Sequence, residues 1–435
     1  MASPTANGAT NGHVESQVRY IPLSYTSTKS ESSARQLILA LQPEWSSSDS
    51  NIEFIRFTDG ITNTLLKAVN RRPGLSKEQI DRDAILLRAY GHGTDVLIDR
   101  QRETQNHELL MKYGLAPALL ARFENGMMYR YIQGRVTQPA DLRSRPVYVA
   151  VARRIAQWHA TVPYTHEIYR SSNGALNGTV HGPYDSPDGS PALGKPTPNV
   201  WTVMQKWIRA LPVGTEAQRT RQAELQRDLG WLVQELSQRP GLGNESLVFA
   251  HCDLLSGNVI IEPKGPGTEG QSGGTREVEG KEQEELSVNF IDYEYATPAP
   301  AAFDLANHFA EWGGFDCDFS VLPTRAQRLE FIREYIKTYS KLIEKTAGGS
   351  ESTCDEDSKV QKLFEEVDVY RGLPGFYWGI WALIQATISQ IDFDYAQYAE
   401  IRLGEFEAWR DELNNTREAS GKEMPLREKR WAQLE

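Results

Sequence analysis

The strongest chemical signal in this sequence is a set of three oxygen-bearing side chains at a defined spacing. Asp253 is followed five residues later by Asn258, and Asp292 comes directly after the apolar segment 288–291. Enzymes that transfer phosphoryl groups use such a pattern, in which the first Asp orients the acceptor hydroxyl while the Asn and the second Asp hold Mg²⁺. Aligning the nucleophile and neutralising the phosphate charge supply most of the catalysis in this reaction. The spacing therefore predicts phosphoryl transfer, with Asp253 as the catalytic residue and Asn258 and Asp292 as the metal ligands.

Each of these residues also has a purely structural interpretation. Asp and Asn often begin turns, cap helices or follow strands. However, segments 259–261 and 288–291 are rich in Val, Ile and Phe, and they predict two short strands that frame the loop. Because both parts of the pattern occur together in that setting, we favour the catalytic interpretation.

Residues 290–296 (FIDYEYA) and 303–312 (FDLANHFAEW) resemble the choline/ethanolamine kinase family. The similarity runs from about Phe57 to about Phe406, and four further segments resemble the ethanolamine branch most: 123–126, 131–134, 381–385 and 391–394. The resemblance implies an α+β, bilobal fold of the protein-kinase-like type, with a small β-rich N-terminal lobe and a larger helical C-terminal lobe. It also implies ATP-dependent phosphorylation of ethanolamine to phosphoethanolamine, the first step of the CDP-ethanolamine route to phosphatidylethanolamine.

Shifts in composition along the chain predict its organisation. We expect a polar N-terminal tail with a short helix (1–50), a nucleotide-binding lobe (51–134), a catalytic and substrate lobe (135–420) and a C-terminal tail (421–435). Segments 171–198, 263–285 and 348–357 are polar and aperiodic, so they are predicted to be surface inserts. Strand-like or helical patterns cover Ser32–Leu41 (helix), Phe54–Phe57, Thr64–Val69, Ala84–Ala89, Val96–Ile98 and Met127–Tyr131 (strands) and Val147–His159 (helix).

The N-terminal lobe contains the candidate ATP-binding residues. Segment 57–63 has Gly and small polar residues, including Thr62 and Asn63, that would let backbone N–H groups approach phosphates, although alone it would predict only a hairpin turn. The resemblance implies that Arg88 grips the phosphates and that Glu103, in a helix capped by Asp99, pairs with it. By the same resemblance the backbone from Arg130 to Ile132 is expected to contact adenine.

The C-terminal lobe contains the candidate acceptor pocket. A small alkylammonium needs hydrogen-bond acceptors or aromatic faces, together with a carboxylate that balances its charge. Besides Asp253, the resemblance implies substrate-binding roles for Tyr295, Glu311, Trp378, Trp381 and Tyr398. The competing interpretation is that aromatic residues at helical spacing form the core, which is the commoner case.

Two features depart from the family pattern. Cys252 stands where the family usually has Asn, which changes the polar support of the catalytic loop. Gly313 and Gly314 lie where choline-preferring relatives bring an aromatic residue close to the substrate, so a cage for a quaternary ammonium looks incomplete. The second feature favours a primary amine.

Three alternatives stay open at this stage. The substrate could be choline, or both amines, because the aromatic residues also suit a trimethylammonium group. The chain could be another small-molecule kinase of the aminoglycoside phosphotransferase type, which would show a broader acidic acceptor pocket. It could also be a non-catalytic pseudokinase scaffold, although a scaffold need not combine Asp253, Asn258, Asp292 and Arg88.

Composition limits the partners. The 435 residues carry a formal net charge of −11, which disfavours a nucleic-acid partner because no basic excess is available to neutralise phosphates. The three cysteines lack zinc or disulfide spacing, and we find neither a signal-like segment nor an apolar run of membrane-spanning length. We therefore expect a cytoplasmic protein without membrane insertion, with Mg²⁺ as cofactor, ATP and a small amino alcohol as substrates, and a homodimer as one assembly open to it.

Overall fold

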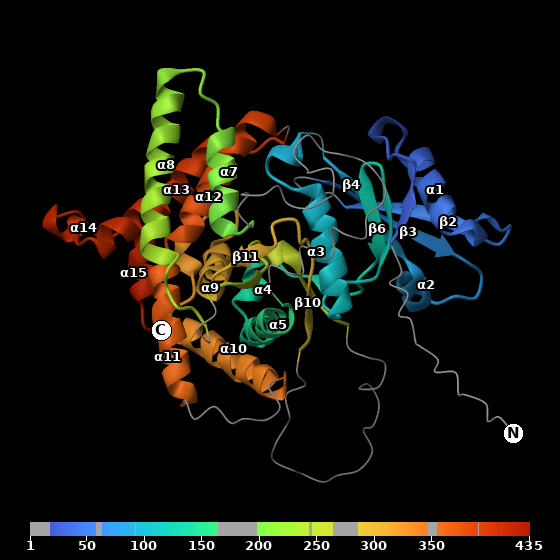
Figure 1. Cartoon of the computed structure of the whole chain (residues 1–435). Coiled ribbons are helices and arrows are strands. Elements are labelled where there is room, and N and C mark those ends of the chain that lie inside the picture. The colour runs from blue at the N-terminus through green and yellow to red at the C-terminus, as the bar shows by residue number, and fades with distance from the viewer. Residues whose placement is uncertain are drawn as a thin grey trace, which may run out of the picture. The chain divides into compact units, whose positions relative to one another are not determined.

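The computed structural model describes residues 18–57, 63–91, 93–163, 198–242, 246–263, 286–346, 355–389 and 391–435. The chain divides into two compact units (Figure 1). The first comprises Met1–Gly91 and Ala118–Tyr131, and the second comprises His92–Pro117 and Ile132–Glu435. This division differs from the predicted lobe boundary at residues 92–117, which belong to the second unit.

The first unit is built on one mixed sheet. The strands are β1 (Arg19–Ile21), β2 (Asn51–Phe57), β3 (Asn63–Arg71), β4 (Ile85–Tyr90), β5 (Leu119–Phe123) and β6 (Gly126–Arg130). They are arranged in the order β1-β5-β6-β4-β3-β2, and all neighbouring pairs are antiparallel except β1 and β5. The helices are α1 (Ser30–Leu41) and α2 (Lys77–Asp83), and α2 begins with a reciprocal capping box between Ser76 and Gln79.

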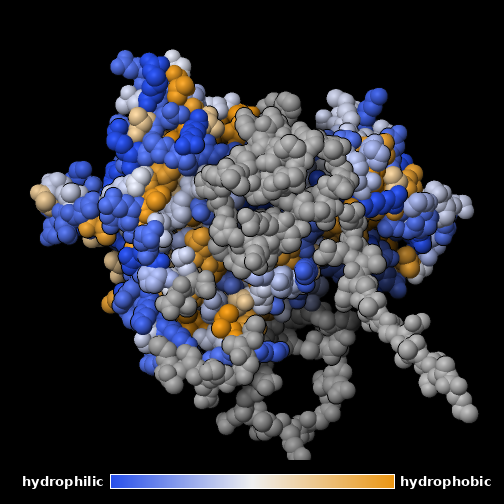
Figure 2. Space-filling model, in the orientation of Figure 1, coloured by the Kyte–Doolittle hydropathy of each residue, from blue (hydrophilic) through white to orange (hydrophobic). Residues whose placement is uncertain are grey.

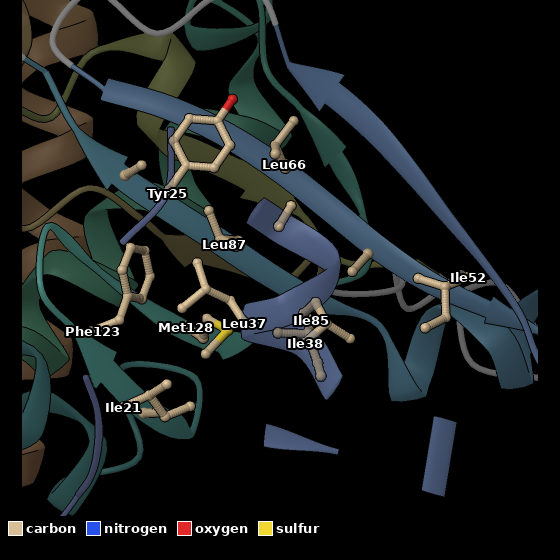
Figure 3. Close-up of a cluster of buried hydrophobic side chains, with 14 of the residues drawn as sticks. Ile21, Tyr25, Leu37, Ile38, Ile52, Leu66, Ile85, Leu87, Phe123 and Met128 are labelled. Carbon is tan, nitrogen blue, oxygen red and sulfur yellow. The ribbon is translucent and has the colours of Figure 1, made fainter. Parts of the chain in front are cut away.

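An apolar core lies between α1 and the sheet (Figure 3). Leu37 and Ile38 of α1 are buried with Leu87 of β4 and Phe123 of β5, so the apolar face of the helix covers one face of the sheet. The helix predicted at Ser32–Leu41 is confirmed, as are the strands predicted within β2, β3, β4 and β6.

The strand predicted at Val96–Ile98 is wrong. Thr94–Val96 forms a 3-10 helix, and Asp99 then accepts a hydrogen bond from the amide of Arg102 as the N-cap of α3 (Arg100–Lys112). The apolar side chains of Leu97 and Ile98 are buried, and this burial rather than strand pairing accounts for apolar residues at these positions.

The second unit combines helices with two small antiparallel sheets, β10-β9-β7 and β11-β8. Its strands are β7 (Arg135–Val136), β8 (Val248–Ala250), β9 (Val259–Ile261), β10 (Val288–Phe290) and β11 (Thr297–Ala299). Its helices are α3, α4 (Pro139–Leu142), α5 (Arg145–Thr161), α7 (Val200–Ala210), α8 (Glu216–Leu236), α9 (Ala301–Ala310), α10 (Arg325–Thr346), α11 (Glu356–Tyr370), α12 (Leu373–Ile388), α13 (Tyr395–Leu413), α14 (Thr416–Ala419) and α15 (Leu426–Ala432). The helix predicted at Val147–His159 and the two strands predicted around the catalytic loop are confirmed.

Aromatic packing fixes the small strands against the helices. Trp158 of α5 is fully buried, and its ring lies 6.1 Å from Phe249 and 6.0 Å from Phe290 between ring centroids. Helices α5 and α10 lie side by side (Figure 1). All residues of α9 are buried. A wholly buried helix beside the short strands offers a rigid support for the loop that joins β8 to β9.

Glycines allow α12 and α13 to approach closely. A Cβ atom at Gly375 would lie 2.4 Å from the backbone oxygen of Arg402, and one at Gly379 would lie 2.6 Å from Leu403 Cγ. Any larger residue at these positions would push the two helices apart.

The C-terminal segment 421–435 is not the tail that its charged composition predicts. It contains α15, in which Arg427 and Trp431 are buried and packed within the second unit. Of the predicted inserts, residues 171–197 and 264–285 lie outside the described residues, as do 348–354, whereas Glu356 and Asp357 begin α11. On the face shown in Figure 2, α8 and α14 are mostly hydrophilic with scattered hydrophobic residues. Among the described helices, none has the length and apolar character needed to cross a bilayer.

Candidate active site

The predicted catalytic residues lie on the loop between β8 and β9. Asp253 follows β8, and Asn258 closes the 3-10 helix Ser256–Asn258 immediately before β9. Nδ2 of Asn258 donates to the backbone oxygen of Asp253 at 2.8 Å and to its carboxylate Oδ2 at 3.0 Å. Both bonds use the amide nitrogen, so the amide oxygen of Asn258 is the atom that can bind a cation.

Strand β10 brings Asp292 to the same place. It pairs with β9 so that Phe290 lies opposite Val259, and the backbone amide of Ile291 donates to the backbone oxygen of Asn258 at 3.0 Å. Asp292 has a φ of 65°, a left-handed conformation that is uncommon outside glycine and that Asp adopts more readily than most residues. The pairing explains why two positions far apart in the sequence meet beside Asp253.

The loop concentrates negative charge. Burial, followed by the charges of Asp292, Glu311 and Glu294, raises the pKa of Asp253 well above its ordinary range. Asn258 and Asp292 offer hard oxygen atoms, as Mg²⁺ requires, and Mg²⁺ commonly binds through one or two carboxylates together with substrate phosphates. Within the described ranges no group of three or more His, Cys, Asp or Glu could hold a metal by itself. The residues present therefore fit a magnesium ion shared with a phosphate ligand.

Helix α9 holds the backbone of the catalytic loop. Asp304 accepts from the amides of His251 (Oδ2, 2.9 Å) and Cys252 (Oδ1, 2.8 Å), and Asn307 donates to the oxygen of Cys252 at 2.9 Å. Oδ2 of Asp304 is also 3.0 Å from Nε2 of His159 on α5. Although burial raises the pKa of Asp304, these partners lower it overall, so its carboxylate stays charged and fixed.

His308 completes this support, one turn beyond Asp304 on α9. Its Nδ1 is 2.8 Å from the oxygen of Leu254 and must donate to it, while Nε2 accepts from Nε1 of Trp312 at 3.3 Å. Burial lowers the pKa of His308 to about 4, and the Trp312 N–H already occupies the nitrogen that protonation would use. His251 likewise supports the loop, since its Nε2 lies 3.1 Å from the oxygen of Ile291. Both histidines therefore support the backbone of the catalytic loop.

His308 predicts a pH dependence of stability. Unfolded His308 takes up a proton near pH 6.5 but the folded residue only near pH 4, so its contribution to stability is complete above pH 6.5 and is lost as the pH falls towards 4. Between pH 7.5 and 5, His308→Gln should lose about 2 kcal/mol less unfolding free energy than wild type, because a glutamine does not titrate. Chemical denaturation at the two pH values measures this difference. An equal fall in both proteins would contradict the assignment.

Three of the predicted pocket aromatics meet beside the loop. Nε1 of Trp381 donates to the Tyr295 hydroxyl at 2.7 Å, and the Trp378 ring lies 5.6 Å from Tyr295 and 5.5 Å from Trp381, edge to face. Nε1 of Trp378 donates to Asn307 at 2.8 Å, so the same residue supports the catalytic loop and the aromatic cluster. Burial, then the charges of Glu294 and Asp253, raises the pKa of Tyr295 well above its ordinary range.

Glu311 and Tyr398 are linked through Arg402 of α13. Oε1 of Glu311 lies 3.2 Å from Nη2 of Arg402, and the guanidinium carbon is 5.7 Å from the centre of the Tyr398 ring. Phe315 lies 6.1 Å from Tyr398, ring to ring, so an aromatic side chain does stand directly after Gly313 and Gly314. The gap predicted at these glycines is therefore narrower than the sequence indicates.

The predicted ATP-binding residues are distributed over both units. Thr62 lies outside the described residues, Asn63 begins β3 opposite Tyr90, and Arg88 lies on β4. Glu103 of α3 accepts from Nη1 of Arg100 at 3.0 Å, and the same nitrogen donates to Glu294 at 3.2 Å. The pairing of Glu103 with Arg88 stays a prediction.

The predicted adenine contacts from the backbone of residues 130–132 stay a prediction, but two of the three N–H groups already have partners. The backbone amides of Arg130 and Tyr131 donate within the first unit to Ala118 and Ala84, at 2.9 and 3.0 Å. The backbone N–H of Ile132 is therefore the candidate donor in this segment.

Residues 54–407 match the model of the choline/ethanolamine kinase family. The chain belongs to this family. Mouse ethanolamine kinase 1 is 30% identical over 86% of this chain and 87% of its own length, and Drosophila melanogaster ethanolamine kinase is 33% identical over 76% of this chain and 55% of its own. The solved structure of an ethanolamine kinase from Plasmodium vivax is 22% identical, covers 86% of both chains and superimposes with a TM-score of 0.62. These findings confirm the predicted family and the kinase-like fold.

At Cys252, which departs from the family pattern, the catalytic loop is held through its backbone groups. Cys252 has a φ of 61°, a conformation in which Asn is more favourable than Cys. Its amide and carbonyl groups are nevertheless bound by Asp304 and Asn307, and its Sγ lies 3.9 Å from the oxygen of Thr297. At this position the backbone of the catalytic loop is therefore held in place without depending on the Cys252 side chain.

Three further residues support the site without having been predicted from the sequence: Asp304, Asn307 and Arg402. A signal for the first two was present, because Asp304, Asn307 and His308 are polar residues at one helical face of an otherwise apolar segment. Polar side chains are buried in this way when each has a hydrogen-bond partner, as these three have. For Arg402 no local pattern indicated a partner 91 positions earlier in the chain.

Proposed function

We infer that this chain is an ethanolamine kinase, which transfers the γ-phosphoryl group of ATP to the hydroxyl group of ethanolamine. The observation that carries this proposal is the meeting of Asp253, Asn258 and the strand end before Asp292, next to a buried group of aromatic residues and Glu311. The relatives that are 30% and 33% identical to this chain are named ethanolamine kinases, which supports ethanolamine as the substrate here.

In this proposal Asp253 orients the acceptor hydroxyl and accepts its proton as the phosphoryl group moves. The amide oxygen of Asn258 and the carboxylate of Asp292 would hold Mg²⁺, which neutralises charge on the phosphate oxygens when it is bound. Helix α9 keeps the loop backbone in place, so little rearrangement is needed at the moment of reaction. Thr62, Asn63, Arg88, Glu103 and the Ile132 amide are proposed to position ATP.

The second candidate substrate is choline. Tyr295, Trp378, Trp381 and Tyr398 provide aromatic faces for a trimethylammonium group, and Phe315 adds another ring near Tyr398. Ethanolamine is favoured because Glu311 brings a buried carboxylate oxygen, Oε1, to this group of side chains. A primary ammonium can donate to such an oxygen, whereas a quaternary ammonium has no N–H group to donate. A cytoplasmic location and a homodimeric state stay predictions.

Glu311→Gln tests the amine pocket. We expect the KM for ethanolamine to rise about tenfold or more, because a hydrogen bond to a charged group is lost, while the KM for ATP changes little. Steady-state kinetics with each substrate varied in turn measures both constants. Glu330→Gln, which removes an ion pair of α10 with Arg145, is the control and should leave both constants unchanged. Equal effects on the two substrates would contradict a role in amine binding.

A further inference from the structure

A chain of buried ion pairs leads from Glu311 to the C-terminal helix α15. Oε1 of Glu311 lies 3.2 Å from Nη2 of Arg402, and Nε of Arg402 lies 3.2 Å from Oε1 of Glu405. Oε2 of Glu405 is then 3.1 Å from Nε of Arg427. The first link is at the proposed amine pocket, and the last is on α15.

Two further pairs continue this series of ion pairs to Arg371. Arg427 lies 2.8 Å from Glu428, which in turn accepts from Nε and Nη2 of Arg371 at 3.0 and 2.9 Å. Arginine and glutamate alternate throughout, so the formal charges of the six residues cancel. Removing one member would leave a buried charge without compensation, which is far less favourable than the intact chain.

The position of Arg402 is set by its backbone as well as by its charges. The backbone oxygen of Arg402 faces Gly375, where a Cβ atom would approach it to 2.4 Å. The close contact of α12 with α13 therefore presents the guanidinium to Glu311 and Glu405 at the same time.

The pair of Glu311 with Arg402 joins two buried groups of opposite charge. Oε1 of Glu311 and Nη2 of Arg402 are both buried and lie 3.2 Å apart. Burial raises the pKa of Glu311, and the positive charge of Arg402 acts in the opposite direction. Arg402 thus helps Glu311 to stay charged.

We propose that Arg402 is a positioning residue of the amine pocket, and that α15 holds Arg402 in place through Glu405 and Arg427. Without Arg427, Glu405 has only Arg402 as a partner and draws its guanidinium away from Glu311. Glu311 then loses the compensation that keeps it charged, and ethanolamine binds less tightly. The inference rests on the proposed function, and it extends the amine site to a helix that contributes no residue to the substrate contacts.

Arg427→Met in the full chain tests this coupling, with Arg328→Met as a matched control. Arg328 is also buried and also supports α15, since it donates to the oxygen of Trp431 at 3.0 Å and stacks 3.9 Å from its ring, but it lies outside the ion-pair chain. Both variants should lower the thermal unfolding temperature. Only Arg427→Met should raise the KM for ethanolamine, by about fivefold or more, with the KM for ATP unchanged.

An equal KM for ethanolamine in the two variants would overturn the proposal, because the effect would then come from the docking of α15 alone. If Arg427→Met does not fold, Arg402→Lys decides, since an ammonium keeps the charge but approaches only one of the two carboxylates. That variant should raise the KM for ethanolamine with the KM for ATP unchanged, and an unaltered KM for ethanolamine would overturn the proposal. If the proposed function itself is wrong, wild-type protein does not phosphorylate ethanolamine, and this result differs from an unaltered KM in the variants.

Discussion

Asp253→Asn should lower kcat for phosphoryl transfer by about two to four orders of magnitude, the usual contribution of a positioned general base. Asparagine has the same shape and can still accept the hydrogen bond from Nδ2 of Asn258, so the loop should stay folded. The loss then reflects the missing proton acceptor. ATP binding should persist, because Asp253 contacts the acceptor rather than the nucleotide.

The measurement combines single-turnover rates with ATP titration by calorimetry. Asp228→Asn is a suitable control, because Asp228 forms a partly exposed ion pair with Arg410 on α13, and the variant should retain wild-type kcat. Turnover of Asp253→Asn within a few-fold of wild type would remove Asp253 from the catalytic role.

Asp292→Asn should produce a different defect. The amide retains one oxygen but loses the negative charge, so Mg²⁺ should bind less tightly. We expect the Mg²⁺ concentration needed for half-maximal rate to rise by roughly 10- to 100-fold or more, because the loss of a residue that only supports a metal ligand already weakens metal binding by that much. Asn is the appropriate substitute because the φ of 65° at this position would strain most other residues. The effect on the metal is then separated from an effect on the backbone.

Magnesium titrations of the initial rate at saturating ATP report this change. Part of the lost rate should return at high Mg²⁺, which is not expected for Asp253→Asn. A Mg²⁺ midpoint equal to that of wild type would contradict the role of Asp292 as a metal ligand, whatever the loss in rate.

Local spacing explains why some of the site could be predicted from the sequence. Asp253 and Asn258 lie on one short loop, and Asp292 follows the strand that pairs beside it, so the chain itself fixes their proximity. The resemblance similarly indicated Tyr295 and Trp381, which the structure joins by a hydrogen bond. Their roles in catalysis and binding stay predictions until they are measured.

Features that depend on distant partners could not be predicted in the same way. The segment around Arg427 is highly charged and has the composition of a solvated tail, yet Arg427 is buried and paired with Glu405 and Glu428. Val96–Ile98 has strand-like residues, but the burial of Leu97 and Ile98 within the second unit and the cap at Asp99 decide its structure. In both cases tertiary contacts outweigh local propensity.

The most direct test of the central claim is a comparison of phosphoryl transfer from ATP to ethanolamine, its mono- and dimethyl derivatives, and choline in one assay. We expect the highest kcat/KM for ethanolamine and a decrease with each methyl group, since each methylation removes an N–H donor to Glu311. A higher kcat/KM for choline than for ethanolamine would contradict the assignment of ethanolamine as the substrate.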